Sequence, residues 1–322
     1  MFLRLKSMII PLSIVLVYAS CGPGTTKITV QRPPNFNTAG VRSIAIMPFE
    51  CTSGCEDIAR HATAITADRI AQTNHFILVD SSEVGRLMRS GQNLENHVDA
   101  VLRGSIVHCN TQQNFNQGSA KDKKGKTEYY TAFITVADVS LNYSLVKTRD
   151  GGIIGPVAHG GTHDVANRET YTSILGHAVR NSQKDNPRKY PSTNEALFAA
   201  VDHYLSSVAT DFAPYSITEN RRFAEDKTND KDRQAAMKNA HAQVREGNFR
   251  LALTSYQNIY EQYKSFAAAE NASILHEALG DNQAAADIIK RVYDDTGNPK
   301  AKEILDRLNQ ILKDQATIDA GR

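Results

Sequence analysis

Short apolar runs recur through the first third of the chain. Residues 42–49 (RSIAIMPF), 75–80 (HFILVD) and 98–109 (VDAVLRGSIVHC) are each brief and rich in aliphatic side chains. The first of these runs is suited to a strand that is buried on both faces. The pattern therefore predicts a buried strand at 42–49, a second strand at 75–80 and a third at 98–109, which ends at Cys109.

The segments between these runs have helical spacing. In the first of them, residues 53–73, the apolar positions near the helical period are Ile58, Ala62, Ile65 and Ile70. Ser53 followed by Glu56 is a capping-box signature. Ser81 or Ser82 is the expected cap of a second helix that runs through Met88. Strands that alternate with helices predict parallel pairing through right-handed crossovers, so the fold class is a mixed α/β domain.

The polar stretch 110–127 (NTQQNFNQGSAKDKKGKT) is expected to be a loop. It contains a basic cluster formed by Lys121, Lys123, Lys124 and Lys126. Such a cluster is either a solvated surface or a contact for anionic envelope polymers or lipid head groups.

A long alternating segment follows, from residue 128 to about residue 148, and Asp150-Gly151 is a hairpin signal before a return strand from Ile153. One face of this segment is largely apolar: Tyr129, Phe133, Ala137, Val139, Leu141, Tyr143 and Leu145, interrupted by Thr131 and Thr135. A soluble sheet packed on helices and a membrane-inserted segment both need such a face, and the soluble sheet is favoured. Two helices are then expected, at about Arg168–Ser182 and Asn194–Phe212.

The N-terminus resembles a bacterial lipoprotein signal. Arg4 and Lys6 precede an apolar stretch, residues 8–18, that is short for a bilayer crossing, which needs about 20 residues. Ala-Ser before Cys21 is similar to a lipobox, although Tyr18 replaces its usual leucine. The resemblance implies acylation of Cys21; an ordinary signal peptide and an uncleaved anchor are the alternatives. Residues 22–40 are expected to be a tether, with a possible edge strand at Lys27–Gln31.

The composition excludes some functions. The formal net charge of +2 gives no electrostatic reason to expect nucleic-acid binding, and the chain has no tryptophan. It contains no G-x-S-x-G, P-loop, H-E-x-x-H or dinucleotide-binding glycine motif. We therefore expect a protein that is not an enzyme and needs no cofactor.

The C-terminal third contains a repeat. Residues 245–260 (REGNFRLALTSYQNIY) and 278–293 (ALGDNQAAADIIKRVY) align with an offset of 33 residues, and tetratricopeptide repeats have about 34. The expected packing positions are Ala240, Gly247, Ala252 and Tyr256 in one repeat, and Ser273, Gly280, Ala285 and Ile289 in the next. Residues 298–314 would form a capping helix. The resemblance to tetratricopeptide scaffolds implies binding of a peptide or helix; a padding role is the alternative.

Three cysteines remain if Cys21 is acylated. Cys51 and Cys55 follow the first strand, and Cys109 ends the third, so neighbouring strands would bring them together. In an oxidising compartment one disulfide is expected, with the pairing left open. Zinc bound by these cysteines with His108 or His61, or a reactive thiol, is the alternative. In HGGTHD (159–164), His159, His163 and Asp164 are expected to be surface residues at a strand end rather than a metal or acid–base site.

The strand sequences together resemble a known envelope domain. VRSIAIMPF, FILVD, DAVLRGSI and LVKTRDGGIIG are similar to segments of CsgG-type curli-secretion lipoproteins, of LpoB-type activators of penicillin-binding proteins, and of the N-terminal domain of TolB. The resemblance implies a non-enzymatic lipoprotein that faces the periplasm, more often from the outer membrane. It implies either docking onto a cell-wall or secretion assembly or membership of an oligomeric secretion channel.

The sequence thus predicts five parts: a signal peptide (1–20), a tether (21–40), a CsgG/LpoB-like α/β domain (41–215), a linker (216–230) and tetratricopeptide-like repeats (231–322). The expected partners are a membrane through the lipid, an envelope protein, and further copies of the chain.

Overall fold

The computed structural model describes residues 24–121, 123–171 and 183–321. The leader 1–20 and Cys21 lie outside the described residues. The chain divides into two compact units, one formed by residues up to Thr29 with Thr218–Asn309, the other by Val30–Ile217 with Gln310–Arg322.

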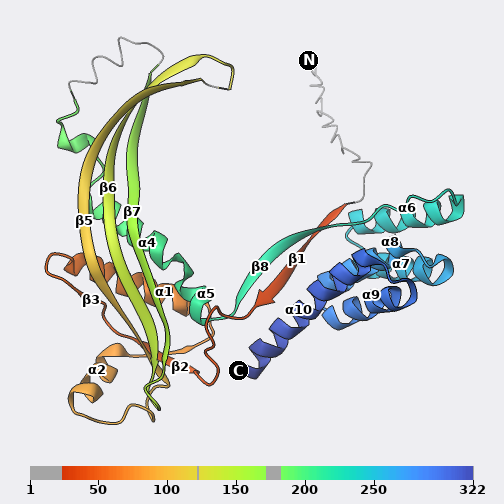
Figure 1. Ribbon diagram of the computed structural model, residues 1–322, viewed down its shortest axis with the longest axis horizontal. Helices are drawn as coiled ribbons and strands as arrows, with labels where there is room; N and C mark the ends of the chain where they lie inside the picture. The colour runs from red at the N-terminus through yellow and green to blue at the C-terminus, as the bar shows by residue number, and fades with distance from the viewer. Residues whose placement is uncertain (1–23, 122, 172–182, 322) are drawn as a thin grey trace, which may run out of the picture. The chain divides into compact units, whose positions relative to one another are not determined.

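The second unit is built on one mixed sheet. Its strands are β2 (Ser43–Ile46), β3 (Glu50–Cys51), β4 (Ile77–Val79), β5 (Ala100–Lys121), β6 (Thr127–Lys147) and β7 (Ile153–Tyr171). The spatial order is β4-β2-β5-β6-β7, with β3 beside β5 (Figure 1). Because β2 pairs in parallel with both β4 and β5, the predicted parallel pairing of the three short strands is confirmed. The mixed α/β class is confirmed as well.

The predicted loop at 110–127 is wrong, because most of it is strand. β5 continues from Cys109 to Lys121 and pairs with β6 in an antiparallel register that places Asn114 opposite Ile134 and Lys121 opposite Thr127. The pairing with an apolar partner strand outweighs the polar sequence of β5, whose side chains there are largely solvated. β5, β6 and β7 thereby form a long curved ribbon (Figure 1).

Helices cover one face of this sheet. These are α1 (Glu56–Gln72), α4 (Thr193–Tyr204), the 3₁₀ turn η2 (Leu205–Ser207) and α5 (Val208–Phe212). The core beneath them contains Ala137, Val139, Leu141, Tyr143 and Leu145 of β6. The interrupting threonines are fully buried on this face, and the Thr135 hydroxyl donates to the Pro191 carbonyl at 2.7 Å. The apolar face of β6 is therefore a sheet packed on helices, as favoured from the sequence.

On the opposite face, α2 (Ser81–Arg89) packs on β2 and the start of β5. The two predicted caps are wrong. Asp80 caps α2, with its carboxylate accepting from the Ser82 N–H at 2.9 Å. α1 begins at Glu56 after Cys55, and Ser53 makes no cap; the Glu56 side chain instead accepts from the Gly54 N–H at 3.0 Å. An aspartate in extended backbone satisfies the first N–H groups better than the serines that follow it.

Gly104 in β5 is required by close packing. A Cβ atom at this position would lie 2.3 Å from the Phe49 ring. We expect Gly104→Ala to lower the free energy of unfolding by about 1–3 kcal/mol, because this ring must shift within a filled core. Urea unfolding would measure the loss. In a Phe49→Ala background the same change should cost little, and Gly85→Ala in α2, where a Cβ meets only ordinary contacts at 3.5 Å, should be neutral or stabilising. An equal cost of Gly104→Ala in both backgrounds would contradict the packing argument.

The connection from β7 to α4 also differs from the prediction. Residues 168–171, expected to begin a helix, are the end of β7, and the rest of that predicted helix, 172–182, lies outside the described residues. A 3₁₀ turn, η1 (Pro187–Lys189), precedes α4. The helix predicted at Asn194–Phe212 is present, broken by η2 into α4 and α5.

Two segments predicted to be a tether and a linker form a ladder. β1 (Thr25–Arg32), in the predicted tether, pairs with β8 (Tyr215–Arg222), in the predicted linker, as a separate two-stranded sheet. The expected edge strand at Lys27–Gln31 is therefore present, but it does not join the large sheet.

The remaining elements are helices in sequence. They are α6 (Lys231–Arg245), α7 (Phe249–Tyr263), α8 (Phe266–Ala278), α9 (Asn282–Thr296) and α10 (Pro299–Gly321). Successive helices pack on one another from α6 to α9. Among the described residues, no helix has both the length and the apolar character needed to cross a membrane.

Candidate functional site

The repeat positions predicted from the sequence lie inside the helical region, which is formed by α6 to α10. Six side chains are buried between the helices: Ala240, Ala252, Tyr256, Ser273, Ala285 and Ile289. Gly247 and Gly280 lie at the turns between α6 and α7 and between α8 and α9, with φ of 78° and 84°. Only glycine adopts this backbone conformation without strain, which explains its recurrence at this offset.

A short segment of the chain lies on these helices in the manner of a bound peptide. Phe223 is 1% exposed and stacks on the Tyr256 ring of α7, with centroids 6.2 Å apart. The next residue, Ala224, is held by its main chain: its N–H donates to Asn271 Oδ1 at 2.6 Å, and its carbonyl accepts from Asn271 Nδ2 at 2.9 Å. A carboxamide that donates and accepts at once recognises any extended backbone, whatever its side chain.

The same segment is fixed at its other end by charge. The Asp226 carboxylate accepts from Arg233 Nε and Nη2, each at 2.5 Å, and from the Ser265 hydroxyl at 2.5 Å. Burial opposes ionisation of Asp226, but the hydrogen bonds from Arg233 and Ser265 outweigh it and lower its pKa. Residues 223–226, which belong to the predicted linker, are therefore anchored to α6, α7 and α8.

An open groove lies beside this segment, between β8, α8 and α10. Its volume is about 220 Å³, and it is lined by Arg221, Arg222, Glu270, Ser273, Ile274, Lys300, Glu303, Ile304 and Arg307. Arg307 connects the groove to Glu277, whose side chain is fully buried. Arg307 forms a two-pronged ion pair with Glu277 at 2.5 and 2.7 Å, and Arg221 Nε lies 3.9 Å from the same carboxylate.

The groove combines two features of peptide sites. Its Ile274 and Ile304 side chains offer apolar contact, and its rim carries both signs of charge, since Lys300 pairs with Glu270 at 2.8 Å while Arg222 is exposed. The buried Arg221 Nε has no hydrogen-bond partner. Such a surface suits an extended segment with an acidic group better than a small apolar ligand.

Several of these residues were missed in the sequence. Asn271 lies in the first helix of the second repeat, where tetratricopeptide repeats have large side chains, and this departure is the available signal that it serves another purpose. Phe223 precedes a charged stretch, EDKTNDKD (225–232), that contains Asp226 and that composition assigns to a joint. Nothing in the local pattern pairs Arg307 with Glu277, because they are 30 residues apart.

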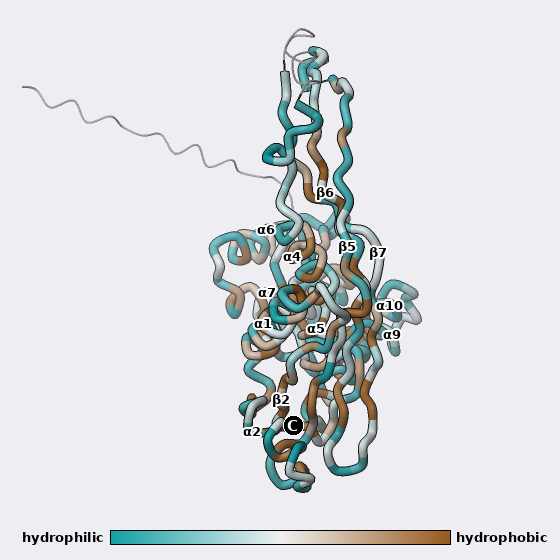
Figure 2. The backbone as a smooth tube through the Cα atoms, turned by 90° about the vertical axis from the view of Figure 1, so that its left-hand side faces the viewer, coloured by the Kyte–Doolittle hydropathy of each residue, from teal (hydrophilic) through white to brown (hydrophobic). Residues whose placement is uncertain are grey.

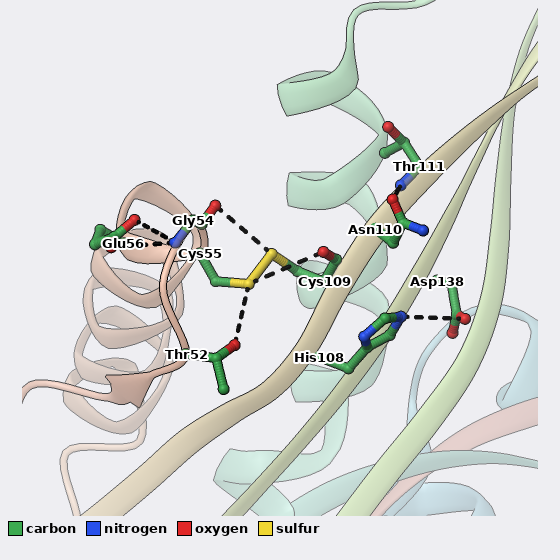
Figure 3. Close-up of a disulfide and its surroundings, with 9 residues drawn as sticks. All are labelled: Thr52, Gly54, Cys55, Glu56, His108, Cys109, Asn110, Thr111 and Asp138. Carbon is green, nitrogen blue, oxygen red and sulfur yellow. Dashed lines mark hydrogen bonds and ion pairs between the residues drawn. A yellow bond between two sulfur atoms is a disulfide. The ribbon is translucent and has the colours of Figure 1, made fainter.

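The three described cysteines converge as expected from strand order. Cys55 and Cys109 form a disulfide with a Cα–Cα distance of 6.1 Å, and Cys51 is a free, half-buried thiol. Figure 3 shows this bond between the start of α1 and β5, beside Thr52 and Gly54. The two bonded sulfurs are not thiolates and cannot bind zinc in this state. Of the histidines considered for zinc, His61 lies 2.8 Å from Asp202, and His108 lies 3.4 Å from Asp138.

The HGGTHD motif is in the middle of β7, so the predicted position at a strand end is wrong. His163 stacks on His203 of α4 at 5.2 Å, and His159 stacks on Tyr204 at 6.2 Å. Gly161 lets α4 approach, since a Cβ there would lie 3.2 Å from the Tyr204 hydroxyl. Asp164 is exposed on the other face. Within the described ranges, no cluster of three or more His, Cys, Asp or Glu side chains is arranged to hold a metal ion.

Comparisons with known proteins give a distant likeness. No protein-family model and no curated protein matches the chain. Among solved structures, the PelC dodecamer of Paraburkholderia phytofirmans is 10% identical, covering 56% of this chain and 97% of its own, with a TM-score of 0.26. A homolog of the neuraminyllactose-binding hemagglutinin from Helicobacter pylori is 8% identical, with coverages of 52% and 85% and a TM-score of 0.29. Lipoprotein GNA1162 from Neisseria meningitidis is 17% identical, with coverages of 44% and 96% and a TM-score of 0.22. The similar structures thus include bacterial lipoproteins, and none of them names the function of this chain.

Proposed function

We propose that this protein is a lipid-anchored, non-enzymatic scaffold of the bacterial envelope that binds another envelope protein through its helical region. The groove beside Asn271 and Glu277 carries the proposal, because its neighbouring surface already holds an extended segment by main-chain and carboxylate contacts. The partner would belong to a cell-wall or secretion assembly. The lipobox-like Cys21 supports the anchor, which would raise the local concentration of the groove near such partners.

Site-specific photocrosslinking tests the groove directly. Benzoylphenylalanine in place of Glu303, on the groove wall, is expected to crosslink one distinct envelope protein in intact cells. The same group in place of the exposed Lys290 on α9 should not form that adduct. Arg222→Glu in the Glu303 background should weaken it, because an acidic partner segment loses a cationic contact. An adduct that is equally strong from both positions, or none from Glu303, would contradict binding at this groove.

A second candidate function is favoured by the free edges of the sheet. β7 is the last strand in the sheet order, so one of its edges is unpaired among the described strands. β3 pairs with β5 only at Ser105 and Ile106, so the residues of β5 after Ile106 pair with β6 alone among the described strands. Long unpaired edges are sites for pairing with another chain. Assembly of several copies into a secretion channel would use these edges, and it predicts a large oligomer that survives detergent extraction.

A further inference from the structure

The far end of the β5–β6–β7 ribbon concentrates positive charge. In the sequence, residues 121–128 contain the lysines Lys121, Lys123, Lys124 and Lys126 and the acidic residues Asp122 and Glu128, and the lysines belong to the hairpin between β5 and β6. At the same end, β7 carries Arg168 and Glu169, and the segment before α4, with Lys184, Asp185, Arg188 and Lys189, lies beside it: Lys189 Nζ pairs with Glu169 at 3.0 Å, and the Lys189 carbonyl accepts from the Asn167 side chain at 2.9 Å. These twelve residues are eight bases and four acids, a net charge of +4. Since the whole chain is +2, the remainder is −2, and the positive charge is segregated to this end.

Tyrosines lie directly behind the lysine hairpin. Tyr129 of β6 pairs across the ladder with Tyr171 of β7, so the two rings share one face of the ribbon. Tyr130 is on the opposite face, where the Arg168 guanidinium lies 4.0 Å from its ring centroid. Gly118 of β5 makes room for this ring, because a Cβ there would lie 2.5 Å from the Tyr130 hydroxyl. The ribbon end therefore carries aromatic rings with polar tips on both faces.

The ribbon carries lysines at its tip and tyrosines next to the tip, along β6 and β7. Both residue types favour the surface of an anionic bilayer. Tyrosine partitions to the level of the head groups, and each lysine near an anionic surface gains about 1 kcal/mol. The tip is too polar to enter hydrocarbon, because β5 presents Asn114, Asn116 and Gln117 just below it. Figure 2 shows this contrast, with β6 partly hydrophobic between mostly hydrophilic neighbours toward the end of the ribbon. At head-group depth, the lysines contact the lipid phosphates and the tyrosines lie in the interface, while the polar residues of β5 stay out of the hydrocarbon.

We propose that the end of the β5–β6–β7 ribbon is a second membrane contact, which docks on the anionic phospholipid surface of a bilayer independently of any acyl chain on Cys21. The lysine hairpin supplies attraction to the phosphates, and the tyrosines supply interfacial contact. This surface is distinct from the groove of the helical region and does not depend on it.

The absence of tryptophan makes the test specific, since one introduced tryptophan reports only on its own position. The probe is the full chain with Cys21→Ser, to exclude an acyl anchor, and Thr127→Trp at the exposed start of β6. On addition of phosphatidylglycerol vesicles, its emission is expected to shift to the blue and to be quenched by brominated acyl chains. Neutral phosphatidylcholine vesicles and inorganic phosphate should produce neither change, and salt should reverse the response. A tryptophan at Leu251, which is 56% exposed on α7, should not respond.

Charge removal provides the matched comparison. Changing the four hairpin lysines to glutamine in the Thr127→Trp chain should weaken binding to anionic vesicles roughly 100-fold or more. Changing four exposed lysines of the helical region, Lys231, Lys238, Lys290 and Lys313, should leave binding within about threefold, although the net charge changes equally. Circular dichroism would show that both variants are folded. The proposal is overturned if the two variants bind alike, if vesicles leave the emission unchanged, or if inorganic phosphate or an acidic polypeptide alone reproduces the shift.

Discussion

Arg307→Ala is expected to destabilise the helical region by about 3 kcal/mol. The Glu277 side chain has no exposed surface, and Arg307 supplies both of its hydrogen bonds. Removing the guanidinium leaves a buried carboxylate with only Arg221 at 3.9 Å, too far for a hydrogen bond. A buried charge that loses its partner costs several kcal/mol, although the solvent that reaches Arg307, 31% exposed, limits the loss. Hydrogen exchange of the α8 and α10 amides in urea would measure it.

Two variants separate the ion pair from packing. Glu277→Leu with Arg307→Met removes both charges and should recover most of the lost stability, since no buried charge is left. Lys300→Ala removes the ion pair between Lys300 and Glu270, in which the lysine side chain is 55% exposed. This change should lower the free energy of unfolding by less than about 1 kcal/mol, because exposed ion pairs contribute little. If Arg307→Ala costs no more than Lys300→Ala, the buried pair does not stabilise the helical region.

Loss of the Cys55–Cys109 disulfide is expected to have a comparable or larger effect on the α/β unit. The bond closes a loop with a sequence separation of 54 residues, and cross-linking such a loop removes about 4 kcal/mol of chain entropy from the unfolded state. It also fixes the start of α1, where Cys55 is 3% exposed. Cys55→Ala with Cys109→Ala should therefore lower the free energy of unfolding by about 2–4 kcal/mol, measured by urea unfolding under oxidising conditions.

Cys51→Ala is the matched control, because Cys51 is a free thiol in the same cluster. It should change stability by less than about 1 kcal/mol, and one alkylated thiol should be found here in the unreduced chain. Alkylation at Cys109 instead, with a large loss of stability in Cys51→Ala, would mean that a different pair is bonded. Metal analysis of the same samples tests the zinc alternative.

The predictable part of the fold is the part set by local pattern. The runs around Ile44 and Leu102 are short and apolar because these residues are fully buried in the sheet, and the alternation of strands with helices predicts parallel pairing. Leu78 lies in the edge strand β4 and is 41% exposed, so this strand is apolar without being buried. The glycines at 247 and 280 mark turns that only glycine makes easily. Each of these features depends on residues within a few positions of one another, so it can be recognised in the sequence.

What the sequence did not reveal depends on distant partners. Residues 110–121 are polar and resemble a loop, and they are a strand only because β6 lies beside them. The same holds for β8, which needs β1 about 190 residues earlier. Asn271 holds Ala224 across 47 positions, and the groove exists only once α8, α10 and β8 are assembled. The candidate site could be located by its repeat, but its chemistry could not be predicted.

The most direct test of the proposed function is the mass of the native particle extracted in detergent, together with the identity of the proteins in it. A scaffold predicts one or two copies of this chain with one distinct envelope protein, and Arg222→Glu should reduce the amount of this complex while the chain stays folded. A homogeneous ring of many identical copies with no other protein would contradict the scaffold and favour assembly through the edges of β5 and β7.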